Sequence, residues 1–306
     1  MTLDDSILAP AAHASPCSSA MPDWACTSLD LAAAVLTSSF TLALLGALAG
    51  AAGGAIAAVR IVERRRFRDE LIKEIRNTNA AIMVCLAICN KALVLKKQHV
   101  LPLRAKFAAD HAAFAEFIRQ RRTGERQGNA VPQIAVDFRT VPGLTFSTGT
   151  LQSLMFGKIS ITGRALALMT TLTETATWLA AANAKRNELL ERMKRSAPGA
   201  PELPALYFGT PSPAGQANRE YPEAVLSVAS HTDELIFFSS TLCCDLLAHG
   251  QELRATFIRR FGRKDAPSVN GVDFSADREA GLMPSETAFS EWLNGLGGQV
   301  IADAGD

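Results

Sequence analysis

The stretch of sequence that decides the fold is residues 31–59, LAAAVLTSSFTLALLGALAGAAGGAIAAV. These 29 residues carry no charge and lie between Asp30 and Arg60. About 20 apolar residues are enough for a helix to cross the hydrocarbon core of a bilayer. A cleavable signal peptide would need a basic start and a shorter apolar region near the amino terminus, and neither is present. We therefore expect a single retained transmembrane helix over 31–59.

The alternative is the buried helix of a soluble protein. Ala and Gly supply 15 of the 29 residues and Ser or Thr four more, so the stretch is only moderately hydrophobic. We favour the membrane because buried helices are usually shorter and are interrupted by polar residues.

Charge is distributed unevenly on the two sides of this stretch. The first 59 residues hold four acids and neither Lys nor Arg, whereas all 31 Lys and Arg follow, together with 26 acids. The positive-inside rule then predicts an extracytoplasmic segment over 1–30 and a cytoplasmic body, anchored in the cell (inner) membrane. The basic residues that flank the membrane are Arg60, Arg64, Arg65, Arg66 and Arg68. They also fit a site for anionic lipid, although interspersed acids favour a plain topology signal.

Three glycines in the apolar stretch are spaced four residues apart. Gly46, Gly50 and Gly54 share one helix face, as in a glycine zipper, and such a face lets another backbone approach closely. This pattern predicts packing into a homo-oligomer or against another membrane protein. Glycine is also frequent in membrane helices without any such role.

The six cysteines divide between the two sides of the membrane. Cys17 and Cys26 lie in the predicted external segment, where a disulfide would form if that compartment is oxidising. The other four would be cytoplasmic and reduced, and Cys85 and Cys89 stand one turn apart in an apolar helix, as small core residues do.

The body, residues 60–264, is predicted to be all-α. Helices are expected over 61–122 with a break near Pro102, over 150–196, and over 222–262. Apolar residues repeat at spacings of three and four in each, and in the first helix two such rows run side by side. Long helices with this seam predict a coiled-coil-like antiparallel bundle. Asn79, a polar residue on the seam, would fix register or oligomer state, or cap a kink.

Two further segments have distinct compositions. The loop over 197–221 is rich in proline, and its Tyr207 and Phe208 are either docking residues or a clip onto the bundle. Residues 265–306 carry eight acids and one base, so we expect a loosely ordered acidic tail.

Basic residues gather where the first and third helices end. If the first helix leaves the membrane and the second returns, both clusters meet at the membrane-distal tip and the acidic tail covers them in competition with an acidic protein partner. Nucleic acid is not expected there because aromatic residues for stacking are sparse. The predicted distal patch comprises Arg119, Arg121, Arg122, Arg126, Arg259, Arg260, Arg263 and Lys264.

No catalytic motif is found, so we expect neither an enzyme nor a cofactor. Helical spacing places weak candidate metal ligands on common faces of the third helix, and each group would need further ligands from neighbouring helices. These candidates are His231, Glu234, Asp245, His249 and Glu252. A nucleophilic pair of Cys243 or Cys244 with His249 is disfavoured, because six residues separate Cys243 from His249 and point the two side chains apart.

The sequence therefore favours a non-catalytic protein. The expected function is a membrane-tethered helical scaffold or signal-coupling module that acts through oligomerisation and protein contacts. The first alternative is a pore-forming or membrane-disrupting effector assembled through the glycine face. The second is a membrane-anchored metal-dependent enzyme.

Overall fold

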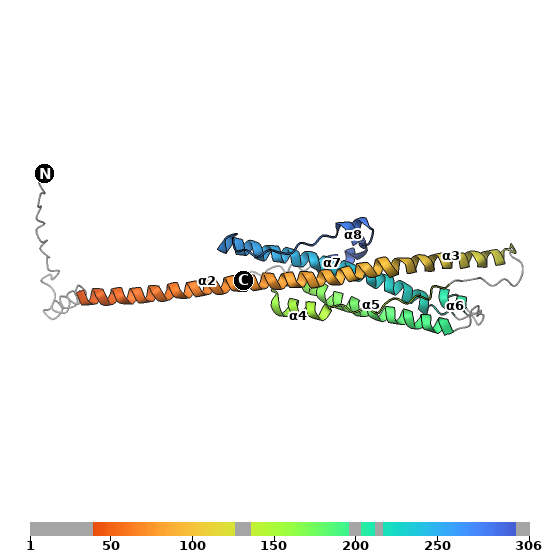
Figure 1. Cartoon of the computed structure of the whole chain (residues 1–306), viewed down its shortest axis with the longest axis horizontal. Coiled ribbons are helices and arrows are strands. Elements are labelled where there is room, and N and C mark those ends of the chain that lie inside the picture. The colour runs from red at the N-terminus through yellow and green to blue at the C-terminus, as the bar shows by residue number, and fades with distance from the viewer. Residues whose placement is uncertain (1–38, 126–135, 196–202, 212–216, 298–306) are drawn as a thin grey trace, which may run out of the picture. The chain divides into compact units, whose positions relative to one another are not determined.

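The structure, a computed structural model, describes residues 39–125, 136–195, 203–211 and 217–297 (Figure 1). All regular elements within these ranges are helices, which confirms the predicted all-α class. The chain divides into two compact units, Met1–Phe67 and Arg68–Asp306. The predicted external segment and the start of the apolar stretch, residues 1–38, lie outside the described residues, as do Cys17 and Cys26.

Helix α2, Ser39–Leu95, is one continuous helix of 57 residues that contributes to both units. Within unit 1, every described side chain between residues 43 and 66 is exposed. Apolar side chains are therefore uncovered on all sides of this part of the helix. The largest of them are Leu44, Leu48, Ile56, Val59, Ile61 and Val62.

The break predicted near Pro102 is a local widening of the helix. After Leu95 the chain forms a π-helix, η1 (Lys96–Val100), and continues as α3 (Leu101–Arg122). The amide of Leu101 donates to the carbonyl of Lys96, five residues back. Pro102 has no amide proton and its ring crowds the carbonyl of Gln98, four residues back, so a wider turn before it relieves the conflict.

The helix predicted over 150–196 consists of two helices. Helix α4 (Thr148–Lys158) ends at Ile159, whose backbone is extended, and α5 (Arg164–Arg195) begins after Gly163. Gly163 has a φ of 63°, which a residue with a side chain adopts only with strain. The β-branched residues Ile159, Ile161 and Thr162 before it have lower helix propensity. The apolar spacing of three and four residues therefore continues through 159–163 in the sequence, but the helix itself is interrupted there.

Helix α7 runs over Glu220–Phe261, close to the range expected from the sequence. It ends at Gly262, which has a φ of 90° and donates its amide to the Ile258 carbonyl. A short helix, α6 (Leu203–Phe208), precedes α7.

Ion pairs and hydrogen bonds fix the directions of the long helices in unit 2. The first residue of α5, Arg164, pairs with Asp245 late in α7, whereas Lys185 and Arg192 near the end of α5 pair with Glu220 at the start of α7. These two helices are therefore antiparallel. Helix α2 is also antiparallel to α7, since the Cys85 thiol donates to the Ser239 carbonyl over 3.1 Å and Lys96 pairs with the earlier residue Asp233.

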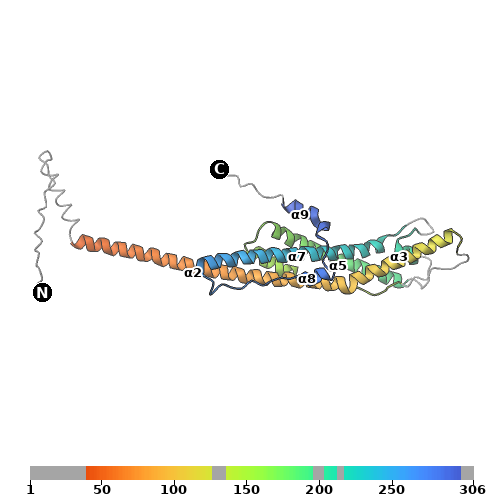
Figure 2. The same cartoon turned by 90° about the horizontal axis from the view of Figure 1, so that it is seen from above.

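Helices α2 and α5 consequently run in the same direction (Figure 2). The return after α3 is made by the chain between α3 and α5. Its described part includes an irregular strap, residues 136–147, and then α4. The strap is fastened to α5: Asn183 donates to the Pro142 carbonyl (2.9 Å) and Asn187 to the Val141 carbonyl (2.8 Å).

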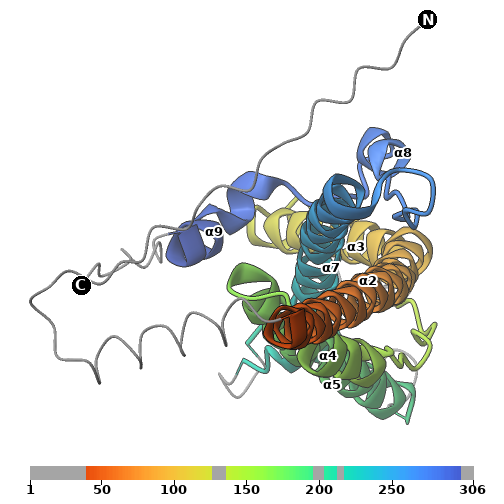
Figure 3. The ribbon, with the colours of Figure 1, turned by 90° about the vertical axis from the view of Figure 1, so that its left-hand side faces the viewer.

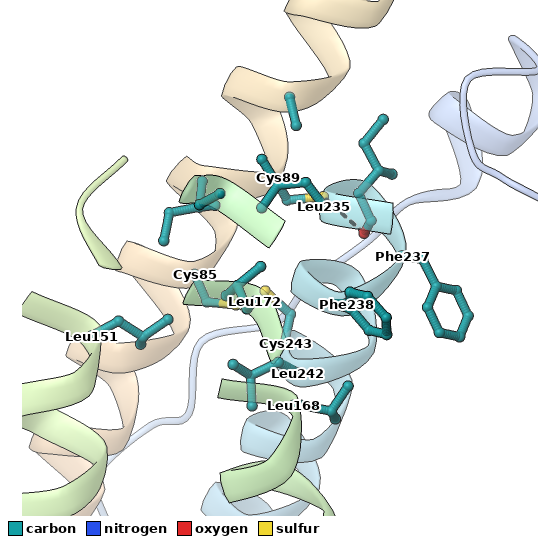
Figure 4. Packing of buried hydrophobic residues seen from close by; sticks show 14 of the residues in the cluster. Cys85, Cys89, Leu151, Leu168, Leu172, Leu235, Phe237, Phe238, Leu242 and Cys243 are labelled. Carbon is teal, nitrogen blue, oxygen red and sulfur yellow. Dashed lines mark hydrogen bonds between the residues drawn. The ribbon is translucent and has the colours of Figure 1, made fainter. Parts of the chain in front are cut away.

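The main core of unit 2 lies between α2, α4, α5 and α7, and Figure 3 shows the last three beside α2 in an end view. Both predicted apolar rows of α2 contribute: one includes Ile75, Ile82 and Cys89, and the other, which includes Cys85 and Ile88, is the more deeply buried. In Figure 4 the side chains of Cys85 and Cys243 meet between Leu151, Leu172 and Leu242. All five are 0% exposed.

A smaller aromatic cluster lies near the end of α3. Tyr207 and Phe208 of α6 are buried against Phe107 and Phe114 of α3 and Tyr221 of α7. Phe208 stacks on Phe114 with ring centroids 4.7 Å apart, and Tyr207 stacks on Tyr221 at 5.1 Å. Of the two roles considered for Tyr207 and Phe208, the structure favours the clip.

The acidic tail is packed in its described part, contrary to the expected loose order. Short helices α8 (Ser275–Glu279), η2 (Glu286–Phe289) and α9 (Ser290–Gly297) lie along unit 2. Phe274 and Leu282 are buried, and Phe289 stacks on Phe237 with centroids 4.1 Å apart. Asn79, expected to fix register, holds this segment by donating to the Ser268 carbonyl at 2.8 Å.

The core should be sensitive to loss of a single side chain. Leu172 is fully buried between α2, α5 and α7, so Leu172→Ala should lower the free energy of unfolding by about 2–5 kcal/mol because it removes contacts and leaves a cavity. Leu226 on α7 is 57% exposed, and Leu226→Ala should change it by about 0.5 kcal/mol or less. Urea unfolding of the full chain in detergent, followed by circular dichroism, measures both. Equal effects of the two substitutions would contradict this packing.

Candidate functional site

The glycine face predicted from the sequence lies on the exposed half of α2. An added Cβ at Gly46, Gly50 or Gly54 would meet no atom within 4 Å, and the same holds for Gly53. Within the described residues of this chain, therefore, nothing packs closely against this face. The face is sterically open to another helix.

One helical run, Gly46–Arg122, is long and apolar enough to span a membrane. Half of its most apolar 18-residue window is buried within the protein. Because no described side chain over 43–66 is buried and the first buried residue of α2 is Leu71, this half-buried window lies within unit 2. The chain thus has two apolar segments on α2, one covered by α5 and α7 and the other uncovered.

The flanking arginines follow the uncovered segment. Arg60, Arg64, Arg65 and Arg66 are exposed residues of unit 1. Arg68, in unit 2, forms an ion pair with Asp265 (3.0 Å), so the start of the tail lies beside this end of α2.

The predicted distal basic patch is wrong, because the structure divides it between opposite ends of unit 2. Arg119, Arg121 and Arg122 end α3, while Arg259, Arg260, Arg263 and Lys264 lie at or just after the end of α7. Helix α7 is antiparallel to α2, and its end therefore lies near Arg68 instead of near Arg122. The expected tail cover over one common tip fails for the same reason. Arg126 is outside the described residues.

A polar network joins α2, the α4–α5 junction and α7 at the Arg68 end of unit 2. The carboxylate of Glu74 accepts hydrogen bonds from the amide of Ser160 (2.9 Å) and from its hydroxyl. The Nε2 atom of His249 lies 3.3 Å from the same oxygen. Burial acts to raise the pKa of Glu74, but these hydrogen bonds outweigh it and the pKa is lowered. The network therefore anchors the reversal of the chain between α4 and α5.

An open groove of about 750 Å³ lies beside this network. Its walls include His249 and Glu252 of α7, and an ion pair between Arg164 and Asp245 crosses from α5 to α7. Ser160 and His249 both contact Glu74 and not each other, so the geometry differs from a serine–histidine–acid triad, in which the serine donates to the histidine.

Four of the candidate metal ligands contact other side chains in the structure. His231 contacts Glu234 at 2.8 Å, His249 contacts Glu74, and Asp245 is engaged by Arg164. Glu252 lines the groove. Within the described part of the chain, no three His, Cys, Asp or Glu side chains are placed to hold a metal ion.

Three of the four described cysteines are core residues. Cys85, Cys89 and Cys243 are buried, and Cys244 is exposed. Burial raises the pKa of Cys89 to about 12 and also raises the pKa of Cys85, and partial shielding of the Cys244 thiol from water raises its pKa as well. Thiols with raised pKa values are protonated at neutral pH and are poor nucleophiles.

Two buried cations were not among the predicted site residues. Lys96 of the π-helix pairs with Asp233 at 2.7 Å and donates to the Leu282 carbonyl of the tail at 2.7 Å. Arg186 of α5 is 1% exposed and donates to the Arg139 carbonyl at 2.7 Å. The sequence does carry a signal for Arg186, since it interrupts the apolar seam between Ala182 and Leu189.

No family model, curated protein or solved structure matches this chain.

The Glu74 network should make stability depend on pH in acid. Because the folded-state pKa of Glu74 lies below its ordinary value of 4.5, its contribution is present above that value and is lost as pH falls through the folded-state pKa. Glu74→Gln should therefore lower the free energy of unfolding by about 1–3 kcal/mol near pH 7, with a difference that shrinks below about pH 4.5. Glu174→Gln, at an exposed site on α5, is the matched control. Urea titrations at pH 7 and pH 3 check this, and a difference that grows in acid would contradict it.

Proposed function

We propose that this chain is a membrane-tethered helical scaffold or signal-coupling module. The observation that carries the proposal is the uncovered apolar half of α2, where Leu48 is 59% and Ile56 56% exposed. Exposed apolar surface of this extent is unfavourable in water and is expected only where lipid or another protein covers it. A helix that is apolar on all sides is typical of a membrane span.

The arginines after this segment support an orientation with unit 2 in the cytoplasm, by the positive-inside rule. In this proposal the helices of unit 2 form a coiled-coil-like bundle that presents protein-binding surfaces at the inner membrane. Because α2 contributes to both units, rotation or displacement of the span would be transmitted along one hydrogen-bonded helix.

The second part of the proposal is that the chain self-associates through the glycine face. Gly50 lies at the centre of the three glycines, and no side chain of the described residues fills the space above it. Close approach of two helix backbones at small residues drives association where both helices are surrounded by lipid.

Gly50→Leu should dissociate the complex, because a leucine side chain would keep the helix backbones apart. Ala52→Leu is the matched control, since residue 52 lies about 200° around the helix from residue 50. The measurement is the mass of the complex extracted from native membranes. We expect a defined oligomer for the wild type and for Ala52→Leu, and a shift to monomer for Gly50→Leu.

A wild-type monomer, or a complex indifferent to Gly50→Leu, would contradict association through this face. Ion leakage on expression that Gly50→Leu abolishes would favour a pore instead of a scaffold.

A further inference from the structure

Positively charged side chains gather where α7 ends, at the Arg68 end of unit 2. Residues 254–264 hold five Lys and Arg and no acid. Four of the five are exposed, and we call them the proximal cations: Arg259, Arg260, Arg263 and Lys264.

The charge of this cluster is not balanced by the neighbouring part of α2. Residues 68–76 of α2 lie beside the last part of α7, since Arg68 pairs with Asp265 at 3.0 Å and Glu74 contacts His249. These nine residues hold three cations and three acids. Residues 252–265 hold five cations and two acids, so the excess of positive charge at this end comes from the end of α7.

The helix dipole explains only part of the cluster. Cations are favoured in the last turn of a helix, and this suits the two arginines before Gly262. Arg263 and Lys264 follow Gly262 and lie beyond the helix. Within the described ranges, no ion pair joins Arg259, Arg263 or Lys264 to a carboxylate, and Arg259 donates to the Thr256 hydroxyl at 3.3 Å.

The segment that carries the proximal cations is held in place on both sides. Before it, Phe257 is 0% exposed and fixes the last turns of α7 in the core. After it, Arg254 donates to the Pro267 carbonyl at 3.1 Å and Asn79 to the Ser268 carbonyl at 2.8 Å. The cations therefore belong to a packed surface of unit 2.

The opposite end of unit 2 has cations in a different setting. There Arg119 forms ion pairs with Glu116 at 2.7 Å and with Glu125 at 3.2 Å. Arg121 and Arg122 beside it are exposed. These two arginines provide a comparison for Arg263 and Lys264, with the same charge at the far end of the same unit.

The proposed membrane span brings the proximal cations close to lipid headgroups. Val59, the last residue of the uncharged stretch, and Arg68 are nine residues apart in α2, which corresponds to about 14 Å of helix. The headgroup layer extends about 5–8 Å beyond the hydrocarbon core. The remaining separation is no more than about one Debye length, over which the negative surface of the cytoplasmic leaflet attracts Lys and Arg.

We propose that the proximal cations bind the headgroups of anionic phospholipids and hold the end of α7 at the membrane surface. This inference rests on the proposed function, because it needs the span to place unit 2 beside the bilayer. Guanidinium groups suit this contact, since they bind phosphate through two parallel hydrogen bonds. The contact gives unit 2 a second attachment to the bilayer besides α2.

The test is amide hydrogen exchange of the full chain in nanodiscs, measured by mass spectrometry on peptides that cover residues 255–266. Discs of phosphatidylcholine are compared with discs in which about one third of the lipid is anionic phosphatidylglycerol. We expect exchange of this segment to be roughly threefold slower or more in the anionic discs, because bound headgroups oppose opening of the helix end. Salt at about 0.5 M should remove the difference by screening the charges.

Charge reversal locates the contact. Arg263→Glu combined with Lys264→Glu leaves the four positions without net charge and should abolish the difference between the two kinds of disc. Arg121→Glu combined with Arg122→Glu makes the same chemical change at the opposite end of unit 2 and should leave the difference intact. All four residues are exposed, so both variants should keep the wild-type circular dichroism spectrum.

Equal exchange in the two kinds of disc would overturn the assignment, as would slowing that Arg263→Glu with Lys264→Glu leaves intact. Equal slowing by inorganic phosphate added to phosphatidylcholine discs would also overturn it, because the site would then take a free anion and not a lipid surface. Co-elution of the chain with the discs separates these outcomes from failure of the span. A chain that enters neither kind of disc contradicts the proposed function, and this inference falls with it.

Discussion

Burial of the apolar rows of α2 between Leu71 and Leu95 is the constraint on which the rest of unit 2 depends. Ile75, Ile82 and Cys89 on one row are each 0% exposed, and Cys85 on the next row is equally buried, so two helices are needed to cover them. Helices α5 and α7 supply this cover, and α4 closes the remaining side. At the edges of this core, polar side chains of α5 hold the strap and polar side chains of α2 hold the tail.

The same helix is uncovered in unit 1, and this contrast carries the functional proposal. Both halves of α2 are apolar, but within the part of the chain that the structure describes only the half in unit 2 packs against other helices. The uncovered half is rich in Ala and Gly and has a face of three glycines. This composition suits contact with lipid and with another helix more than exposure to water.

Much of the secondary structure could be predicted from spacing. Apolar residues at intervals of three and four indicated the helices, and Gly262 indicated the end of α7. The interruption at 159–163 was hidden because Leu154, Ile161 and Leu168 keep the same rhythm on both sides of it. Helix direction could not be predicted, since parallel and antiparallel seams have the same spacing. The predicted distal patch was wrong because it assumed helix directions that the structure does not have.

Other features depend on contacts between residues far apart in sequence. The tail is acidic and rich in Gly, Pro, Ser and Asp, so its composition suggested loose order, yet Phe289 packs on Phe237 and Trp292 on Phe238 of α7. Two polar groups hold the tail: Asn79 was noticed in the sequence as a polar residue on the seam, but for another role, and Lys96 resembles an ordinary surface residue. Arg186 was visible as an interruption of the seam, but its hydrogen bond to the Arg139 carbonyl of the strap joins residues 47 positions apart.

The central claim is that the uncovered half of α2 lies in a bilayer. Its most direct test is extraction of membranes with alkaline carbonate, comparing the full chain with a variant that carries both Leu44→Lys and Leu48→Lys. Each lysine at the centre of a span should cost about 2.5–3.5 kcal/mol. The account predicts that the wild type stays in the membrane pellet and that the double variant is released. Release of the wild-type chain into the supernatant would contradict it.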